Sequence, residues 1–439
     1  MTDDVPARIL QEASEKCERA EVYSQEGETC SVRFERNSLK RITTRQFRGV
    51  GLRVFHNGRI GFASSTDLRE PGRLVELACE AAEFGEKANF EFPERPDELP
   101  EVATNDESLD DVSAADMVDI MREGLEMSVS ADADYMFDGK ISRTTHVRRI
   151  LNSRGLDQSY RQTGMNGMVS IEHISDSGML SVGERKSWGQ PFDSVTDITS
   201  TALDKMKQGS TITPARTDTL PVVFTPKAVG VVFSPVLMAV SGKLVYKGSS
   251  VLQGKVGEQV LDSRLSITDD PTVDYGVGSG PIDDEGVPVK PFPIIEDGVL
   301  KGYMFDLHTA AYLDTQSTGH GYRSYSSQPS PSGTNTLVAA GEDDVDEMIT
   351  DLDRAVIVDE VLGAGQSNTL AGEFSVNVSL GFLVEDGKIQ GRVKDCMVAG
   401  NSYEVLSEVR SVSNQREWVG SNLFPTICVG ELKLASQGG

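Results

Sequence analysis

The 439-residue chain lacks the features that mark membrane, secreted and nucleic-acid-binding proteins. It contains no run of roughly 18 apolar residues, the length that a membrane-spanning helix requires. Its start has no apolar signal segment, since the first ten residues are MTDDVPARIL. Acidic residues outnumber basic ones by 68 to 42, a net charge of −26, and the basic runs are too short to form a stripe for a polyanion. We therefore expect a cytoplasmic protein with no membrane and no nucleic-acid partner.

Cysteine and histidine are scarce, with five of each. The cysteines are scattered without a C-x-x-C pair, so we predict reduced, mostly buried thiols and neither a disulfide framework nor a thiolate zinc site. No two histidines are four residues apart and H-E-x-x-H is absent, so the sequence offers no helical metal site. The five cysteines are Cys17, Cys30, Cys79, Cys396 and Cys428, and the five histidines are His56, His146, His173, His308 and His320. The motifs alone predict no catalytic residue and no metal ligand.

Hydrophobic periodicity predicts an α+β protein of three domains. Residues 1–95 are expected to form an N-terminal antiparallel sheet with helices, the first helix capped by Thr2 or Asp3. Residues 112–213 are expected to form a middle α+β domain whose first helix follows a capping box at Ser113. Residues 218–439 are expected to form a large, mostly antiparallel β-rich domain with a few helices.

The elements expected within these domains are short and separated by clear turn signals. Asn57-Gly58, Asp297-Gly298 and Asp386-Gly387 are typical of tight hairpin turns. In the C-terminal domain we expect strands at 220–225, 293–303, 373–385 and 425–435, and helices at 226–241, 304–313 and 342–351.

A glycine-rich stretch at 276–280 has the composition of a phosphate loop but not its context. Neither G-K-[ST] nor a preceding buried strand is present, and Asp283, Asp284 and Glu285 follow, which would repel phosphate. We therefore expect a flexible loop and then a solvated acidic turn, with a hard cation as the alternative ligand of the three acids.

Five segments of the C-terminal domain resemble the TldD/PmbA family. NSRG at 152–155 and the segment from Arg45 to Ser64 are similar to its earlier domains, so the resemblance covers nearly the whole chain. The C-terminal segments are VVFTPKAVGVVFSPVLMAVSG (222–242), GSSVLQGKVGEQV (248–260), DDEGVPVKPFPIIEDGVLKGYMFD (283–306), STGHGYR (317–323) and GEFSVNVSLGFLVEDGKI (372–389). The resemblance implies a relative of zinc-dependent peptidases in which a TldD-type subunit is paired with a PmbA-type (TldE) subunit.

The chain departs from the TldD type at the metal site. In TldD-like members one helix carries H-E-x-x-G-H, with two zinc ligands and a general base, whereas Ser234, Pro235 and Ala239 occupy those positions here. The cysteine that is a third ligand in TldD-like members also has no counterpart, because Cys428 falls within the predicted last strand. We interpret Ser234-Pro235 as a helix N-cap followed by proline at the first helical position. The resemblance thus implies a PmbA-like chain with no catalytic residue, no metal and no cofactor of its own.

Three functions are compatible with this pattern. The leading hypothesis is a non-catalytic PmbA/TldE-type subunit, inactive alone, that works with a zinc-bearing TldD-type subunit on unfolded or short peptides. The alternatives are a stand-alone peptidase with an unrecognised site and a protein that binds peptides without hydrolysing them. A homodimer is an open alternative for the chain purified alone. We expect the partner to dock on the C-terminal domain, where the apolar run Val229 to Val240 and the hairpin at 293–303 have the composition of an exposed interface. The alternative is that Leu237 in this run belongs to the core.

The loop from Ser317 to Asn335 is the candidate peptide-binding segment. It is rich in glycine, serine and proline, and His320, Arg323 and Asn335 could offer hydrogen bonds to a peptide or its carboxylate. The alternative is a solvated surface loop in which Arg323 pairs with a nearby acid.

Overall fold

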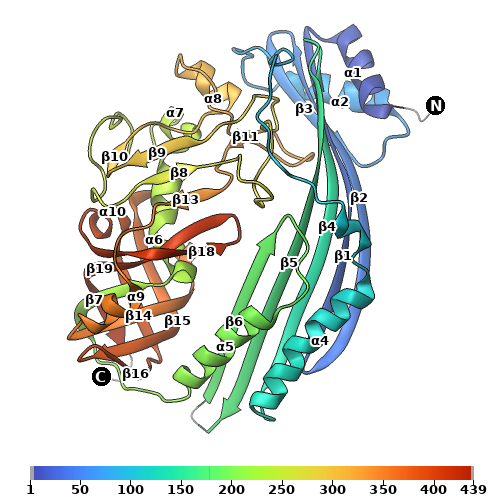
Figure 1. The fold of residues 1–439 in the computed structure, drawn as a ribbon. Coiled ribbons are helices and arrows are strands. Elements are labelled where there is room, and N and C mark those ends of the chain that lie inside the picture. The colour runs from blue at the N-terminus through green and yellow to red at the C-terminus, as the bar shows by residue number, and fades with distance from the viewer. Residues whose placement is uncertain (1–3, 177, 437–439) are drawn as a thin grey trace.

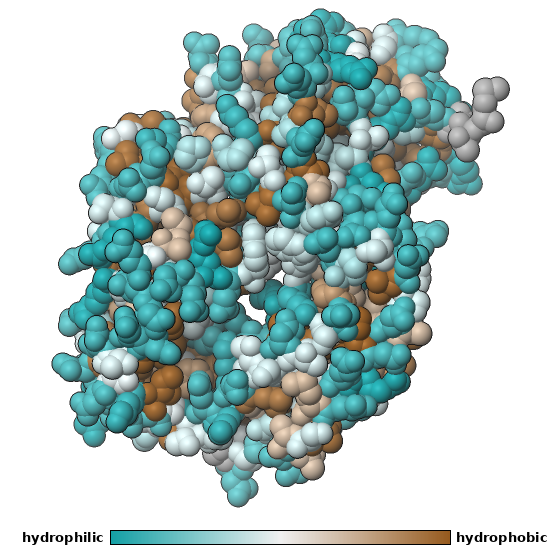
Figure 2. Space-filling view, in the orientation of Figure 1, coloured by the Kyte–Doolittle hydropathy of each residue, from teal (hydrophilic) through white to brown (hydrophobic). Residues whose placement is uncertain are grey.

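The computed structural model describes residues 4–176 and 178–436. A long curved sheet with helices at both of its ends lies beside a C-terminal α+β unit, and Figure 1 shows the two side by side. Figure 2 shows a hollow between them near the centre of this face. No helix of the described ranges combines the length and the apolar character needed to cross a bilayer.

The curved sheet has six antiparallel strands in the order β3-β2-β1-β4-β5-β6. The predicted domains 1–95 and 112–213 both contribute to it, because β1 pairs with β4 from Glu21 to Phe34. The strands are β1 (Arg19–Glu35), β2 (Ser38–His56), β3 (Arg59–Ser65), β4 (Met136–Asn152), β5 (Asp157–Ser175) and β6 (Gly178–Trp188). Asn57 and Gly58 have φ values of 52° and 70°, as the predicted β2–β3 turn requires.

Helices pack on this sheet in two groups. At one end α1 and α2 cover a core that includes Ile9, Leu52 and Val75, and at the other end α4 and α5 cover a second core. The helices are α1 (Val5–Lys16), α2 (Pro71–Ala82), α3 (Ser108–Asp111), α4 (Ala114–Ala131) and α5 (Thr196–Gly209).

The helix caps agree only in part with the predicted ones. Asp4 caps α1 by accepting from Ala7 N, whereas the predicted caps Thr2 and Asp3 lie outside the described residues. The capping box of α4 is confirmed, because Ser113 and Asp116 exchange side-chain-to-backbone hydrogen bonds.

The C-terminal unit is built on an eleven-stranded, mostly antiparallel sheet, which confirms the predicted fold class. Only the pairs β13–β19 and β14–β7 are parallel. Its strands are β7 (Asp218–Phe224), β8 (Ile267–Asp269), β9 (Phe292–Glu296), β10 (Val299–Leu300), β13 (Thr336–Val338), β14 (Arg354–Leu362), β15 (Glu373–Glu385), β16 (Lys388–Arg392), β17 (Cys396–Asn401), β18 (Val409–Val419) and β19 (Asn422–Ser436).

Shorter elements complete this unit. Strands β11 (Gly321–Tyr322) and β12 (Ser330–Pro331) form a separate pair. The helices are α6 (Pro226–Ala239), α7 (Gly242–Tyr246), α8 (Leu307–Tyr312), α9 (Val345–Thr350) and α10 (Ser402–Val405), with 3₁₀ turns at Ala364–Gln366 and Thr369–Ala371.

The apolar run of α6 is core, so its assignment as an exposed interface was wrong. Val229, Val232, Phe233, Val236 and Val240 are all fully buried in the cluster around the C-terminal sheet. The partly buried Leu237 packs against the same cluster. The run is continuously apolar because α6 is enclosed on most sides, and this also hides its periodicity.

One edge of the curved sheet is open. Strand β3 pairs with β2 from Val50 to His56, so among the described strands residues 38–49 of β2 pair with β1 alone, and Gly49 is covered by Tyr325. Leu39 and Ile42 are 45% and 47% exposed on this edge. The same stretch carries four basic residues, Lys40, Arg41, Arg45 and Arg48.

Buried charges join the curved sheet to the C-terminal unit. Arg53 on β2 donates from Nε and Nη2 to the carboxylate of Glu21 on β1, with both distances 3.1 Å, and from Nη1 to Glu285 at 2.7 Å. All three side chains are at most 3% exposed. The rings of Phe90 and Phe92 lie 5.1 and 5.0 Å from the guanidinium carbon. One cation thus neutralises acids that are 264 positions apart in the chain.

The substitution Arg53→Ala should destabilise the fold by about 3–5 kcal/mol, because it leaves Glu285 buried without a cation. The control is Arg73→Ala, which removes an exposed ion pair with Glu76 on α2 and should change stability by less than about 1 kcal/mol. Denaturant unfolding of both variants measures the difference, and equal effects would show that the junction does not depend on this arginine.

Candidate functional site

A cavity of about 640 Å³ opens beside the exposed face of α6. The predicted position Ser234 lines it together with Leu237 and Met238. The opposite wall comes from residues 331–334, Thr336 and the start of β19 at Asn422 and Phe424.

Helix α6 keeps its course through the substituted motif. It begins at Pro226 after Thr225 and contains Pro235, so the predicted N-cap at Ser234 was wrong. A proline nitrogen carries no hydrogen, so the carbonyl of Val231 loses its helical donor. Pro235 and Ala239 are buried, and the carbonyl of Pro235 accepts a 3.1 Å hydrogen bond from the Tyr403 hydroxyl. Only Ser234 of the three positions faces the cavity.

The described residues that line the cavity include none of the usual zinc ligands and no carboxylate. None of the described residues that line it is His, Cys, Asp or Glu, and Lys243 is its one ionisable side chain. Within the described chain no hydrogen bond joins the Ser234 hydroxyl to a general base. The described lining therefore consists of apolar and hydrogen-bonding groups with a single cation.

The three candidate peptide-binding residues are buried and engaged with the protein itself. His320 is 1% exposed, with Nδ1 2.9 Å from Thr318 Oγ1 and Nε2 3.2 Å from an oxygen of Asp269. Asp269 also accepts from the backbone and the hydroxyl of Thr334, both at 2.6 Å. His320 thus holds the loop to β8.

Arg323 makes the ion pair expected of the alternative hypothesis, but in the interior. Its Nη2 lies 2.8 Å from Glu21, its side chain is fully buried, and its guanidinium lies 4.8 Å from the ring centre of Tyr23. The backbone nitrogen of Arg323 donates to Asp284 at 2.8 Å. The loop is consequently a second bridge to the curved sheet at Arg323, whereas Ser324, Ser326 and Gln328 are exposed. It is in part the surface loop of the alternative hypothesis, with the Arg323 side chain in the interior.

Asn335 organises the glycine-rich stretch. Its Oδ1 accepts from Gly278 N at 2.9 Å, and its Nδ2 donates to Asp270 O at 2.7 Å and to Ser279 Oγ at 2.9 Å. A Cβ on Gly278 would lie 2.5 Å from the carbonyl oxygen of Thr334, so only glycine fits there. The stretch is a packed turn fixed by an amide, not the flexible loop that the sequence predicts.

The acids after this stretch are buried, so the predicted solvated turn was wrong. Asp283, Asp284 and Glu285 are at most 3% exposed. Asp283 accepts three backbone N–H groups, from Glu285, Val287 and Gly321. Burial is the main cause that raises the pKa of Glu285 to about 7, although the charge of Arg53 opposes it.

Arg148 is a candidate that sequence reasoning missed. It lines a cavity of about 530 Å³ with Asp284, its side chain is 24% exposed, and Nη1 lies 3.5 Å from that carboxylate. Burial, and then the charge of Arg148, lower the pKa of His146 to about 4, which leaves a neutral imidazole to accept the Arg148 Nε–H at 3.2 Å. Arg148 is the cation of this region that solvent reaches and that could meet a carboxylate.

The sequence matches two family profiles. Residues 217–436 match the PmbA/TldA metallopeptidase C-terminal domain, and residues 20–82 match the PmbA/TldA metallopeptidase domain 1. The chain belongs to the TldD/PmbA family.

The similarity of this TldD/PmbA family member to relatives and to solved structures covers almost the whole chain. An uncharacterized protein of Methanocaldococcus jannaschii is 28% identical over 90% of this chain and 92% of its own. The metalloprotease PmbA of Escherichia coli O157:H7 is 25% identical over 99% and 96%. The crystal structure of TldE from Thermococcus kodakarensis has a TM-score of 0.89 at 23% identity and covers 98% of this chain and all of its own.

The stability of this TldD/PmbA family member should depend on pH through Glu285. Its pKa is about 7 in the folded chain and 4.5 ordinarily, so its contribution is complete below about pH 4.5 and is lost as the pH rises through 7. The unfolding free energy of the wild type minus that of Glu285→Gln should therefore fall between about pH 5 and pH 7, by up to about 1.4 kcal/mol per pH unit. Denaturation of both proteins across this range measures it, and a constant difference would contradict the burial argument.

Asn335→Ala should cost about 2–4 kcal/mol, because it removes three hydrogen bonds and leaves buried partners unpaired. Asn335→Asp keeps the acceptor for Gly278 but loses both donors, so it should also destabilise. The exposed Asn414→Ala should change stability by no more than about 0.5 kcal/mol. Thermal unfolding compares the three, and an unaffected Asn335→Ala would show that the glycine-rich turn holds without the amide.

Proposed function

We propose that this chain is a non-catalytic PmbA/TldE-type subunit of a zinc-dependent peptidase. The observation that carries the proposal is the cavity beside α6, whose described lining offers no zinc ligand and no carboxylate base. Family membership and the fold support it, since the chain shares the architecture of TldE while Ser234, Pro235 and Ala239 replace the motif. The catalytic zinc then belongs to a TldD-type partner.

The chemistry of the cavity suits an unfolded or short peptide. Leu237, Met238 and Phe424 offer apolar contacts, while Ser234 and Asn422 offer hydrogen-bonding groups. An extended peptide presents both kinds of group along its length, so a mixed wall binds it without recognising one sequence. In this arrangement the present chain supplies a wall, and the partner supplies the water-activating metal and base.

The similarity of this chain to TldD-type proteins supports a TldD-type partner. A metalloprotease TldD homolog of Haemophilus influenzae is 37% identical over 39% of this chain. Two chains with a common fold but different motifs are suited to form a pair in which one active site suffices.

The assay compares this chain, a TldD-type protein with an intact H-E-x-x-G-H motif, and the two mixed. We expect co-purification of the pair, hydrolysis of unfolded peptides by the pair, and none by this chain alone even with added Zn²⁺. A chelator, or Gln in place of the partner's motif glutamate, should abolish the activity. Chelator-resistant hydrolysis by this chain alone would favour the stand-alone peptidase, and peptide binding by the chain without any effect on a TldD-type protein would favour the binding protein.

The contribution of the cavity is tested with Met238→Asp. Met238 is 38% exposed, and a carboxylate at this position should raise KM for apolar peptides about tenfold, roughly the loss of one buried apolar side chain. Val129→Asp is the matched control, because Val129 is an equally exposed helical residue, 39%, on α4. If both variants assemble normally and have the same KM, the α6 cavity is not part of the peptide site.

A further inference from the structure

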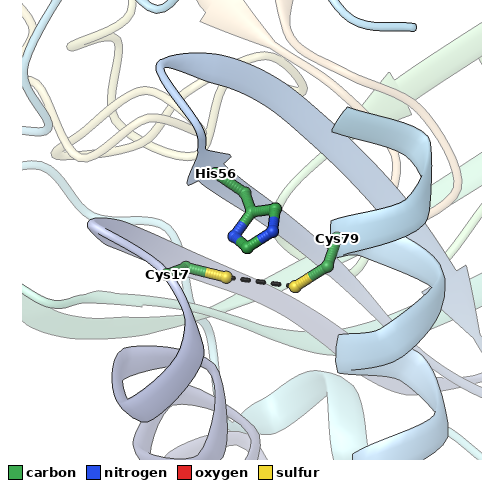
Figure 3. A group of neighbouring side chains, drawn as sticks. All are labelled: Cys17, His56 and Cys79. Carbon is green, nitrogen blue, oxygen red and sulfur yellow. Dashed lines mark hydrogen bonds between the residues drawn. The ribbon is translucent and has the colours of Figure 1, made fainter. Parts of the chain in front are cut away.

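Three soft-metal ligands that are distant in the sequence meet in the N-terminal part of the fold. Cys17 is the residue that ends α1, His56 is the last residue of β2, and Cys79 lies in α2. The two sulfur atoms are 3.2 Å apart, and both lie within 4.8 Å of an imidazole nitrogen. Figure 3 shows the three side chains pointing toward one another from their three elements.

These separations are close to those of a tetrahedral zinc site. Zn–S bonds of about 2.3 Å and Zn–N bonds of about 2.0 Å place neighbouring ligand atoms roughly 3.5–3.8 Å apart. The sulfurs would separate by about half an ångström, and the imidazole would move inward by about one ångström or less, which side-chain rotation can supply. A half-buried Cys₂His set leaves the fourth position open to water.

The ligand set matches the charge of a divalent cation. A bound Zn²⁺ deprotonates coordinating thiols, and two thiolates neutralise its charge, so the completed site can remain half-buried. Both cysteines also pack against the apolar core under α1 and α2, which limits their freedom to turn away.

We propose that Cys17, His56 and Cys79 form a zinc site that ties α1 and α2 to the end of β2. The site is separate from the α6 cavity, and the proposal differs from the expectation that this chain holds no metal. The C-x-x-C criterion missed it because each ligand comes from a different element. With water as the fourth ligand, the bound metal would stabilise this end of the fold, since it would join the two helices over the β2–β3 turn.

The test uses the full chain, purified under reducing conditions and stripped of metal with a chelator. Titration with Co²⁺ should produce thiolate-to-cobalt charge-transfer absorption and tetrahedral ligand-field bands that saturate at one equivalent. Zn²⁺ should abolish both and should raise the melting temperature. Cys79→Ala should lose the charge-transfer band or most of its intensity, and His56→Gln should weaken Co²⁺ binding and shift the ligand-field bands.

The matched control is Cys396→Ala, a buried cysteine of the C-terminal unit that should leave the Co²⁺ spectrum unchanged. Circular dichroism establishes that each variant is folded, and His56→Gln decides the matter if Cys79→Ala does not fold. The proposal is overturned if the reduced wild type gives no charge-transfer band, if the spectrum survives both ligand substitutions, or if a Cys17–Cys79 disulfide persists in reductant and excludes the metal.

Discussion

The arrangement of the two halves depends on pairing of buried charge across their junction. Glu21 receives Arg53 from the neighbouring strand and Arg323 from the C-terminal loop, while Arg53 also holds Glu285. Charges are costly to remove from water unless each is matched, so these side chains tolerate burial only when both halves are in place. The junction therefore acts as a single unit: the loop with His320 and Arg323, and the acids at 283–285, have their present positions because the curved sheet supplies their partners.

Local features of the fold could be predicted from sequence because the determining interactions are local. The Asn57-Gly58 turn, the Ser113–Asp116 capping box and the hairpin at Asp386-Gly387 are each set by residues a few positions apart. The membership of the TldD/PmbA family could also be identified, because the segments that carry the resemblance are short and continuous in the sequence. The α+β class follows from the same periodicities.

The remaining features could not be predicted because their causes are tertiary. Three consecutive acids followed by glycine indicate a solvated turn. In the folded chain Arg53, 232 positions before Glu285, pairs with Glu285 and allows it to be buried, and no local pattern indicates this contact. Loop composition likewise gave Arg323 an exposed position, whereas Glu21 draws it inside. Cys17, His56 and Cys79 lack any spacing rule, since three separate elements bring them together.

The open edge of β2 has a consequence for the protein's behaviour in concentrated solution. Residues 38–48 have no described strand partner on this side, beside the exposed Leu39 and Ile42, and such a strand can template cross-strand aggregation. Lys40 and Arg48 pair with Glu35 and Glu26, whereas Arg41 and Arg45 are exposed and add positive charge to this edge of a chain whose net charge is −26. If two copies paired through these edges, their like charges would come together. Electrostatic repulsion therefore opposes extension of the sheet by a second copy at this unpaired edge.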